Sequence, residues 1–181
     1  APSKWNNAGT YVLEPSVLTR IDDGRRVSVE REVFPALVRD RSLFALDGET
    51  YWIDAGTPET YIRAQLDLTE GLRGEPVPAI AASARVAGGA TVRRSVVGPE
   101  AVVEAGARVE GAVVLAGATV RADAVVEGSI VGFGAEVAAG AHVGPCSIIG
   151  DHQVVAAGAR LDGVKQPADC PLGGSHAHPG D

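Results

Sequence analysis

The sequence has few aromatic residues, no methionine and no long apolar run. Aromatic residues make up 4% of its 181 residues, so we expect a hydrophobic core built mostly from valine, alanine, leucine and isoleucine. No segment is long and apolar enough to span a bilayer, and the N-terminal residues lack the apolar stretch of a signal peptide. These absences predict a cytoplasmic protein without a membrane partner.

Basic residues are also scarce. The chain has 16 Lys and Arg against 23 Asp and Glu, a formal charge of -7. Because nucleic acids and anionic membranes are bound by clustered Lys and Arg, this balance argues against both as partners. Cys146 and Cys170 lie in dissimilar contexts without metal-ligand spacing, and we expect free thiols in a reducing compartment.

The second half contains a repeat. Aliphatic residues, nearly all valine, recur every 17 residues in three columns, with steps of six, five and six residues inside each period. This pattern predicts a coil of three short strands that each send one side chain inward, with corners that need small residues or left-handed backbone. Coils stacked about 4.8 Å apart would form a one-dimensional core. The columns are Val86, Val103, Val120, Val137 and Val154; Val92, Val109, Val126 and Val143; and Val97, Val114, Val131 and Ile148.

The repeat sets the predicted domain boundaries. Residues 84–164 are expected to form the β-helix, after a linker at 74–83 that contains the two prolines of "EPVPAI". In the last coil, Ile149, Val155 and Leu161 carry a shifted six-residue step, which predicts an altered final turn. Residues 165–181 are expected to be a tail.

Residues 1–73 mix strand and helix signals. We expect a strand over 7–13, a short helix opened by Pro15, and a helix capped by Ser28 that Pro35 ends or kinks. Two further strands are predicted on either side of the turn pair Asp47-Gly48.

Asp54 follows the second of these predicted strands. Thr57 and Pro58 are start signals for another helix, expected to run to about Leu68 with Tyr61, Ala64, Gln65 and Leu68 along one side. Open α/β sheets place ligand sites where a strand ends before a helix. A carboxylate there can bind Mg²⁺, with Gly56 leaving room beside it, and a structural or capping acid is the alternative.

Three segments carry a family resemblance: "NAGTYVLEPSVL", "VSVEREVFPAL" and "YWIDAGTPETYIRAQLDL". In this order and spacing they resemble bacterial sugar-1-phosphate nucleotidyltransferases, most of all the mannose-1-phosphate guanylyltransferase (GDP-mannose pyrophosphorylase) group with its C-terminal hexapeptide β-helix. The resemblance spans residues 5 to about 163. It implies a mixed fold, in which the C-terminal part of an α/β nucleotidyltransferase domain (1–73) precedes a left-handed parallel β-helix.

The resemblance also implies an activity. A sugar-1-phosphate oxygen would attack the α-phosphorus of a nucleoside triphosphate (NTP), pyrophosphate would leave, and Mg²⁺ would neutralise charge. It implies that Asp54 is one of two metal-binding carboxylates and that Asn7 lies at the sugar pocket, where Gly9 allows close approach. The family's glycine-rich loop G-x-G-x-R-L-x-P, its other metal aspartate and its phosphate-contacting lysines have no match here. We therefore expect a chain that lacks the nucleotide-binding part and does not turn over alone.

Two other classes stay open. A hexapeptide acyltransferase needs a general-base histidine, and the repeat contains only His142, in a variable outward position, and His152. A loose metal site at His176 and His178 is a weaker alternative. The third reading is an assembly or regulatory module, because open coil ends are self-association surfaces and predict a homo-oligomer.

Overall fold

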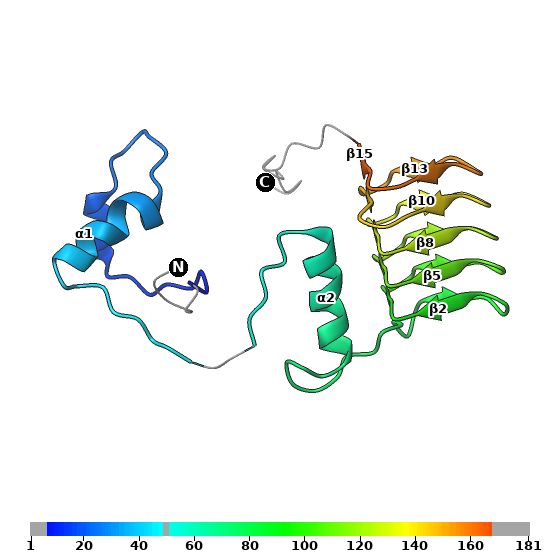
Figure 1. Ribbon diagram of the computed structural model, residues 1–181, viewed down its shortest axis with the longest axis horizontal. Helices are drawn as coiled ribbons and strands as arrows, with labels where there is room; N and C mark the ends of the chain where they lie inside the picture. The colour runs from blue at the N-terminus through cyan, green and yellow to red at the C-terminus, as the bar shows by residue number, and fades with distance from the viewer. Residues whose placement is uncertain (1–6, 49–50, 168–181) are drawn as a thin grey trace, which may run out of the picture. The chain divides into compact units, whose positions relative to one another are not determined.

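The structure is a computed structural model that describes residues 7–48 and 51–167. The chain divides into two compact units, residues 1–52 and 53–181, and each is described by itself (Figure 1). We expected a division at residues 74–83. The helix that precedes these residues instead belongs to the same unit as the repeat, because it packs on it.

Helices form the regular structure in the described part of the first unit. Pro15 opens the first helix, and Ser28 caps the second by accepting a hydrogen bond from the Arg31 N–H at 3.3 Å, as predicted. Pro35 does not end the helical segment. The segment changes from a π-helix to an α-helix just before Pro35, which is the second residue of the α-helix. The elements are the 3₁₀ helix η1 Pro15–Arg20, the π-helix η2 Val29–Val33 and the α-helix α1 Phe34–Arg39.

The strands predicted in this half are wrong for the residues that the structure describes. Residues 7–14, 42–48 and 51–56 are not in strands, while 49 and 50 lie outside the described residues. A strand needs a neighbouring strand to satisfy its N–H and C=O groups, and β-propensity alone does not supply one. The expected α/β layer is therefore not formed in the described part of residues 1–73.

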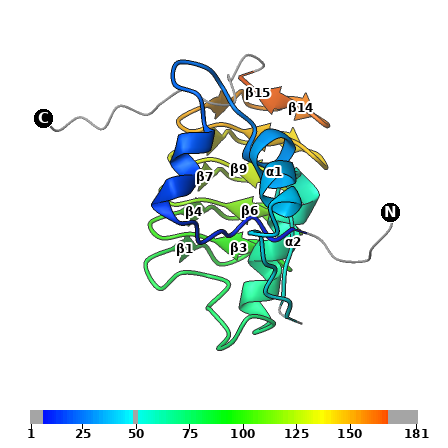
Figure 2. The ribbon, with the colours of Figure 1, turned by 90° about the vertical axis from the view of Figure 1, so that its left-hand side faces the viewer.

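In its described residues, 53–167, the second unit is a parallel β-solenoid with one α-helix, α2 Pro58–Thr69. Three five-stranded sheets run along the solenoid, and each coil adds one strand to each sheet (Figures 1 and 2). We call them the β1 sheet (β1-β4-β7-β10-β13), the β2 sheet (β2-β5-β8-β11-β14) and the β3 sheet (β3-β6-β9-β12-β15). The strands are β1 Arg85–Val86, β2 Thr91–Arg93, β3 Val96–Val97, β4 Val102–Val103, β5 Arg108–Glu110, β6 Val113–Val114, β7 Thr119–Val120, β8 Val125–Glu127, β9 Ile130–Val131, β10 Glu136–Val137, β11 His142–Val143, β12 Ile148–Ile149, β13 Val154–Val155, β14 Arg160–Leu161 and β15 Lys165–Gln166.

The register confirms the three predicted columns except at the last members of two of them. Val155, rather than Val154, pairs with Val137, and Ile149, rather than Ile148, pairs with Val131. Six residues separate Val143 from Ile149, whereas the other coils have five at this corner. This additional residue moves the whole last coil by one position, which is the shift that the sequence predicted.

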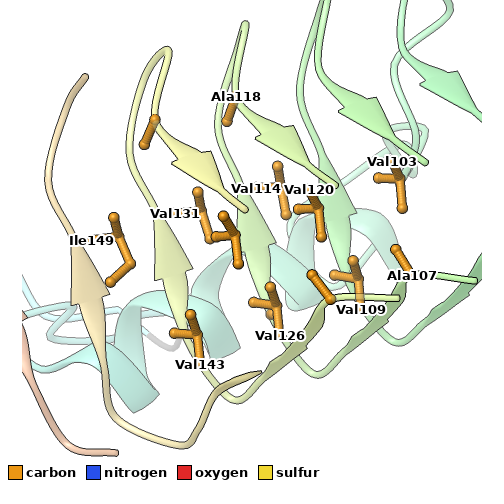
Figure 3. Packing of buried hydrophobic residues seen from close by; sticks show 14 of the residues in the cluster. Val103, Ala107, Val109, Val114, Ala118, Val120, Val126, Val131, Val143 and Ile149 are labelled. Carbon is orange, nitrogen blue, oxygen red and sulfur yellow. The ribbon is translucent and has the colours of Figure 1, made fainter. Parts of the chain in front are cut away.

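The core is one continuous cluster of small aliphatic side chains, built from three ladders. The valines of successive coils lie above one another with alanines between them, and most have no exposed surface (Figure 3). Fully burying a valine contributes roughly 1.5–3 kcal/mol, so a core without aromatic residues is sufficient here.

The solenoid begins earlier and ends later than predicted. Ile80 pairs with Val97 in a parallel bridge, so the expected linker 74–83 already contributes to the first coil. At the other end Lys165 and Gln166 pair with Ile148 and Ile149, although a tail was expected from residue 165. The remaining residues of that expected tail, from 168, lie outside the described part.

Helix α2 covers the outer face of the β3 sheet. Its Ile62 and Leu66 are buried against Val113. The bounds of α2 match the prediction, but its buried face is centred on these two residues rather than on Tyr61, Ala64, Gln65 and Leu68. None of the helices in the described residues has the length and apolar character needed to cross a membrane.

Candidate functional site

Asn7 is the centre of a small polar cluster in the first unit. Its Nδ2 donates to the Tyr11 hydroxyl at 2.6 Å and to Glu30 Oε1 at 2.8 Å. The Tyr11 hydroxyl also donates to Glu30 Oε1, at 2.7 Å. The hydrogen bond to Glu30 raises the pKa of Tyr11 above its ordinary value, because ionising the phenol beside a carboxylate is unfavourable.

Gly9 shapes the backbone at this cluster. Its N–H donates to Asn7 Oδ1 at 2.9 Å, and its φ of 75° lies in the left-handed region that favours glycine. The ring of Tyr11 meets that of Phe34 edge-on, with centroids 4.9 Å apart. The loop 7–11 is therefore tied to the helical segment that begins after Ser28.

The sugar-pocket role expected for Asn7 and Gly9 stays a prediction, and the sequence did not indicate the contacts that Tyr11 and Glu30 make with Asn7. Glu30 was read as a first-turn helix acid, and no role was assigned to it. The contacts from Asn7 and Tyr11 cross 23 and 19 residues of chain, and no local pattern carries such information.

Asp54 lies in the second unit, so it is described apart from Asn7 and Gly9. The Gly56 N–H donates to Asp54 Oδ1 at 3.1 Å, which makes a tight turn just before Thr57. A Cβ on residue 56 would stand 3.1 Å from the same oxygen, so glycine leaves the carboxylate its room. The predicted helix follows, but the strand expected before Asp54 is absent from described residues 51–54.

A metal site is not completed by the residues that the structure describes. None of their His, Cys, Asp and Glu side chains form a group of three or more that could hold an ion. Asp54 supplies an exposed carboxylate with one oxygen engaged by Gly56. Its chemistry suits one Mg²⁺ ligand, but a magnesium site needs further ligands.

The first turn of α2 is held from two sides. Thr57 and Thr60 form a capping box, in which each side chain meets the other's backbone N–H. Glu59 Oε1 accepts a hydrogen bond from Cys146 Sγ at 2.8 Å. This bond lowers the pKa of Glu59 and raises that of the Cys146 thiol, because it favours the carboxylate and the protonated thiol. A groove of about 500 Å³ runs beside the contact between α2 and the solenoid corners.

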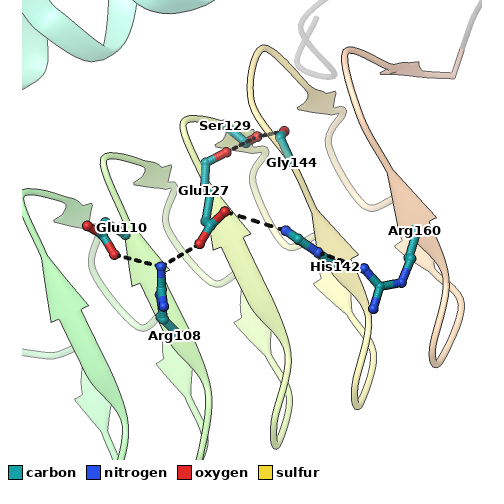
Figure 4. Close-up of polar contacts among 7 residues, drawn as sticks. All are labelled: Arg108, Glu110, Glu127, Ser129, His142, Gly144 and Arg160. Atoms are coloured by element: carbon teal, nitrogen blue, oxygen red, sulfur yellow. Dashed lines mark hydrogen bonds and ion pairs between the residues drawn. The ribbon is translucent and has the colours of Figure 1, made fainter.

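His142 lies in a row of charged side chains on the outer face of the β2 sheet (Figure 4). Arg108 bridges Glu110 at 3.0 Å and Glu127 at 2.6 Å. Glu127 lies 3.5 Å from Nε2 of His142, whose Nδ1 is 3.4 Å from an Arg160 nitrogen.

The setting of His142 does not favour an acyltransferase base. Its Nε2 has almost no exposed area and makes no hydrogen bond, although it faces Glu127. Coils of 17 residues, and one of 18, leave no room for the loop that such enzymes project from the solenoid. His152 is on a different corner, beside Gly134. His176 and His178 lie outside the described residues.

The repeat and the three-sheet solenoid define the class of hexapeptide-repeat β-solenoid proteins. A family model for the GMPPB C-terminal domain matches residues 75–165, half of the chain, and the chain belongs to this family.

Three curated relatives carry closely similar names. A mannose-1-phosphate guanylyltransferase of Mycobacterium tuberculosis is 47% identical over 77 residues, which are 41% of this chain and 21% of that protein. A mannose-1-phosphate guanyltransferase of Schizosaccharomyces pombe is 52% identical over 56 residues, 31% of this chain and 15% of the relative. A probable mannose-1-phosphate guanylyltransferase of Arabidopsis thaliana is 37% identical over 91 residues, 50% of this chain and 27% of the relative. The match therefore spans about a quarter or less of each relative's length.

Proposed function

We propose that these residues serve nucleotidyl transfer from an NTP to a sugar-1-phosphate, which gives a nucleotide sugar and pyrophosphate. GTP and mannose-1-phosphate are the substrates that we favour. The observation that carries the proposal is the agreement among relatives named mannose-1-phosphate guanylyltransferase. The three resemblance segments of residues 5–73 support the same activity, and they lie outside the matched solenoid family.

In this proposal the chain's own residues bind and orient the sugar-1-phosphate. The Asn7 carboxamide, oriented by Gly9 and Glu30, would hydrogen-bond sugar hydroxyls. Asp54 would supply one carboxylate ligand to Mg²⁺, which neutralises phosphate charge when bound. Phosphoryl transfer depends mostly on such positioning and charge neutralisation.

The first unit supports the expectation that 181 residues do not suffice for turnover. Val33 and Leu37 are its buried apolar residues within the described part, whereas Val12, Phe44 and Leu46 are almost fully exposed. Large apolar side chains in this state are typical of a surface that another part of a protein covers. The glycine-rich phosphate loop and the second metal aspartate also have no match here.

Pyrophosphate release tests the proposal. The complete gene product that carries these residues should form GDP-mannose and pyrophosphate from GTP, mannose-1-phosphate and Mg²⁺, while the 181-residue chain should form neither. Absence of both products with the complete protein, together with a thermal shift by acetyl-CoA and none by GDP-mannose, would support the acyltransferase instead.

Self-association through the solenoid is a second proposed role. In the first coil Ile80 and Val86 are 41% and 37% exposed, although the later residues of the β1 and β3 ladders are buried. The strands of this coil also have one unpaired edge, which can accept a second chain. We propose a homo-oligomer through this end, and sedimentation that shows a monomer at all concentrations would contradict it. The left-handed sense of the coil and a cytoplasmic location stay predictions.

A further inference from the structure

The β3 sheet is apolar on both faces in its first four coils, unlike the other two sheets. Its outward positions in the first three coils are Val96, Val113 and Ile130, and all three pack in the cluster formed with α2. The corresponding outward positions of the β2 sheet include Thr91 and Arg108. Val113 is 1% exposed although it points away from the solenoid core, so α2 is a required cover for this sheet.

The fourth coil has a modified corner beneath the first turn of α2. Cys146 has a φ of 60° and occupies the position of Gly111 and Gly128 in the preceding coils. Cys146 lies three residues before Ile149, as Gly128 lies three residues before Val131, and both have left-handed backbone, which establishes the equivalence. The Cys146 N–H donates to the Gly128 carbonyl at 2.9 Å. Left-handed backbone disfavours a residue with a Cβ, so a side chain here calls for a compensating contact.

That contact is the hydrogen bond from Cys146 Sγ to Glu59, which crosses 87 residues of chain. Gly111 and Gly128 have no side chain with which to reach the helix. Arg94, the left-handed residue at this corner of the first coil, lines the groove beside α2. The corner that carries the additional residue is thus the one that holds the start of α2, which begins four residues after Asp54. Between them, the Gly56 N–H on Asp54 Oδ1 joins the carboxylate to the helix cap.

We propose that the solenoid positions Asp54 through α2, with Val113 holding the middle of the helix and Cys146 its first turn. Both are positioning residues, because they act on Asp54 through the helix. The inference rests on the proposed function, because that proposal makes Asp54 a ligand of Mg²⁺. The physical coupling between the solenoid and residues 54–62 can be measured without that role.

Hydrogen exchange in the complete gene product tests the coupling. Val113→Thr places a hydroxyl under α2, while Val125→Thr makes the same change at an outward position of the β2 sheet, outside the cluster formed with α2. Amides of residues 57–62 should exchange ~3- to 10-fold faster in Val113→Thr than in the wild type. A change of this size is expected when about one stabilising contact is lost. Val125→Thr should match the wild type.

Substitutions of Cys146 separate positioning from general stability. Cys146→Gly removes the hydrogen bond to Glu59 but suits the left-handed backbone, so the melting temperature should not fall while exchange at 57–62 rises. Cys146→Ser keeps a donor and should restore slow exchange. In the nucleotidyl transfer assay, Cys146→Gly should lower kcat several-fold and leave KM for mannose-1-phosphate nearly unchanged.

The outcomes distinguish this inference from the proposed function. If the wild type catalyses no transfer, the proposed function fails, and exchange still decides whether the solenoid holds residues 54–62. If exchange at 57–62 is the same in Val113→Thr, Cys146→Gly and Val125→Thr, the inference is overturned whatever the activity.

Discussion

Asn7 donates a hydrogen bond to Glu30 across 2.8 Å, although 23 residues separate them. Glu30 Oε1 accepts from both Asn7 and Tyr11, so a single carboxylate oxygen orients the amide that the family resemblance places at the sugar pocket. A residue read from sequence as a helix-start acid thus becomes an orienting group.

Removing this carboxylate should weaken sugar binding. In the complete gene product, Glu30→Ala should raise KM for mannose-1-phosphate ~3- to 10-fold, because the Asn7 amide loses a fixed partner. Glu75→Ala, which changes an exposed acid after α2, is the matched control and should leave KM unchanged. Equal KM values for both variants would show that Glu30 does not orient Asn7.

The core should respond to substitution according to coil position. Val120 has no exposed surface in the middle of its ladder, whereas Val86 is 37% exposed in the first coil. Val120→Ala should lower the free energy of unfolding by roughly 2 kcal/mol and Val86→Ala by about half as much or less. Urea unfolding of the 181-residue chain measures both. Equal losses would contradict a core that is continuous through the middle coils and open at the first.

Lowering the pH should break a stabilising ion-pair network on the solenoid surface, because its carboxylates become protonated. Arg121 forms a two-bond contact with Glu136, at 3.0 Å each, and bonds Glu104 at 2.8 Å. These bonds lower the pKa of both carboxyls below 4.5, so each binds protons less readily folded than unfolded. The stabilisation is therefore complete above the unfolded pKa of 4.5 and is lost as pH falls through the lower folded values.

Melting temperatures between about pH 6 and about pH 3 test this sign. Arg121→Gln should melt below the wild type at the upper end, and the difference should shrink as the pH falls. Arg85→Gln, at an exposed position of the β1 sheet, should show a difference from the wild type that does not change with pH. A gap between Arg121→Gln and the wild type that stays constant or widens toward acid would refute the network's role.

The sequence predicted the solenoid well because its inward positions repeat. A ladder such as Val103 to Val137 needs the same residue type in every coil. The 17-residue period of the sequence therefore predicts directly which side chains lie above one another. The spacing of Ile149 and Val155 indicated the shift of the last coil. The position of the additional residue, between Val143 and Ile149, became clear only from the strand register. The apolar pairs Val113-Val114 and Ile130-Val131 were an unused signal that α2 covers the β3 sheet.

The candidate site was less predictable. The predicted strands around Asp47-Gly48 failed because turn and strand propensities do not specify a pairing partner. Thr57 and Pro58 predicted the start of α2 correctly, because a helix cap depends only on residues that are neighbours in the sequence. The contacts of Glu30 with Asn7, and of Cys146 with Glu59, join distant segments and depend on tertiary structure alone.

The most direct test of the account is the effect of Asp54 on nucleotidyl transfer in the complete gene product. Asp54→Asn keeps the size of the side chain but removes the charge, and GDP-mannose formation from GTP and mannose-1-phosphate should fall on the order of 10²-fold or more. Asp23→Asn, at another exposed acid, is the control and should keep the wild-type rate. Wild-type turnover in Asp54→Asn would contradict the central claim that Asp54 serves this reaction.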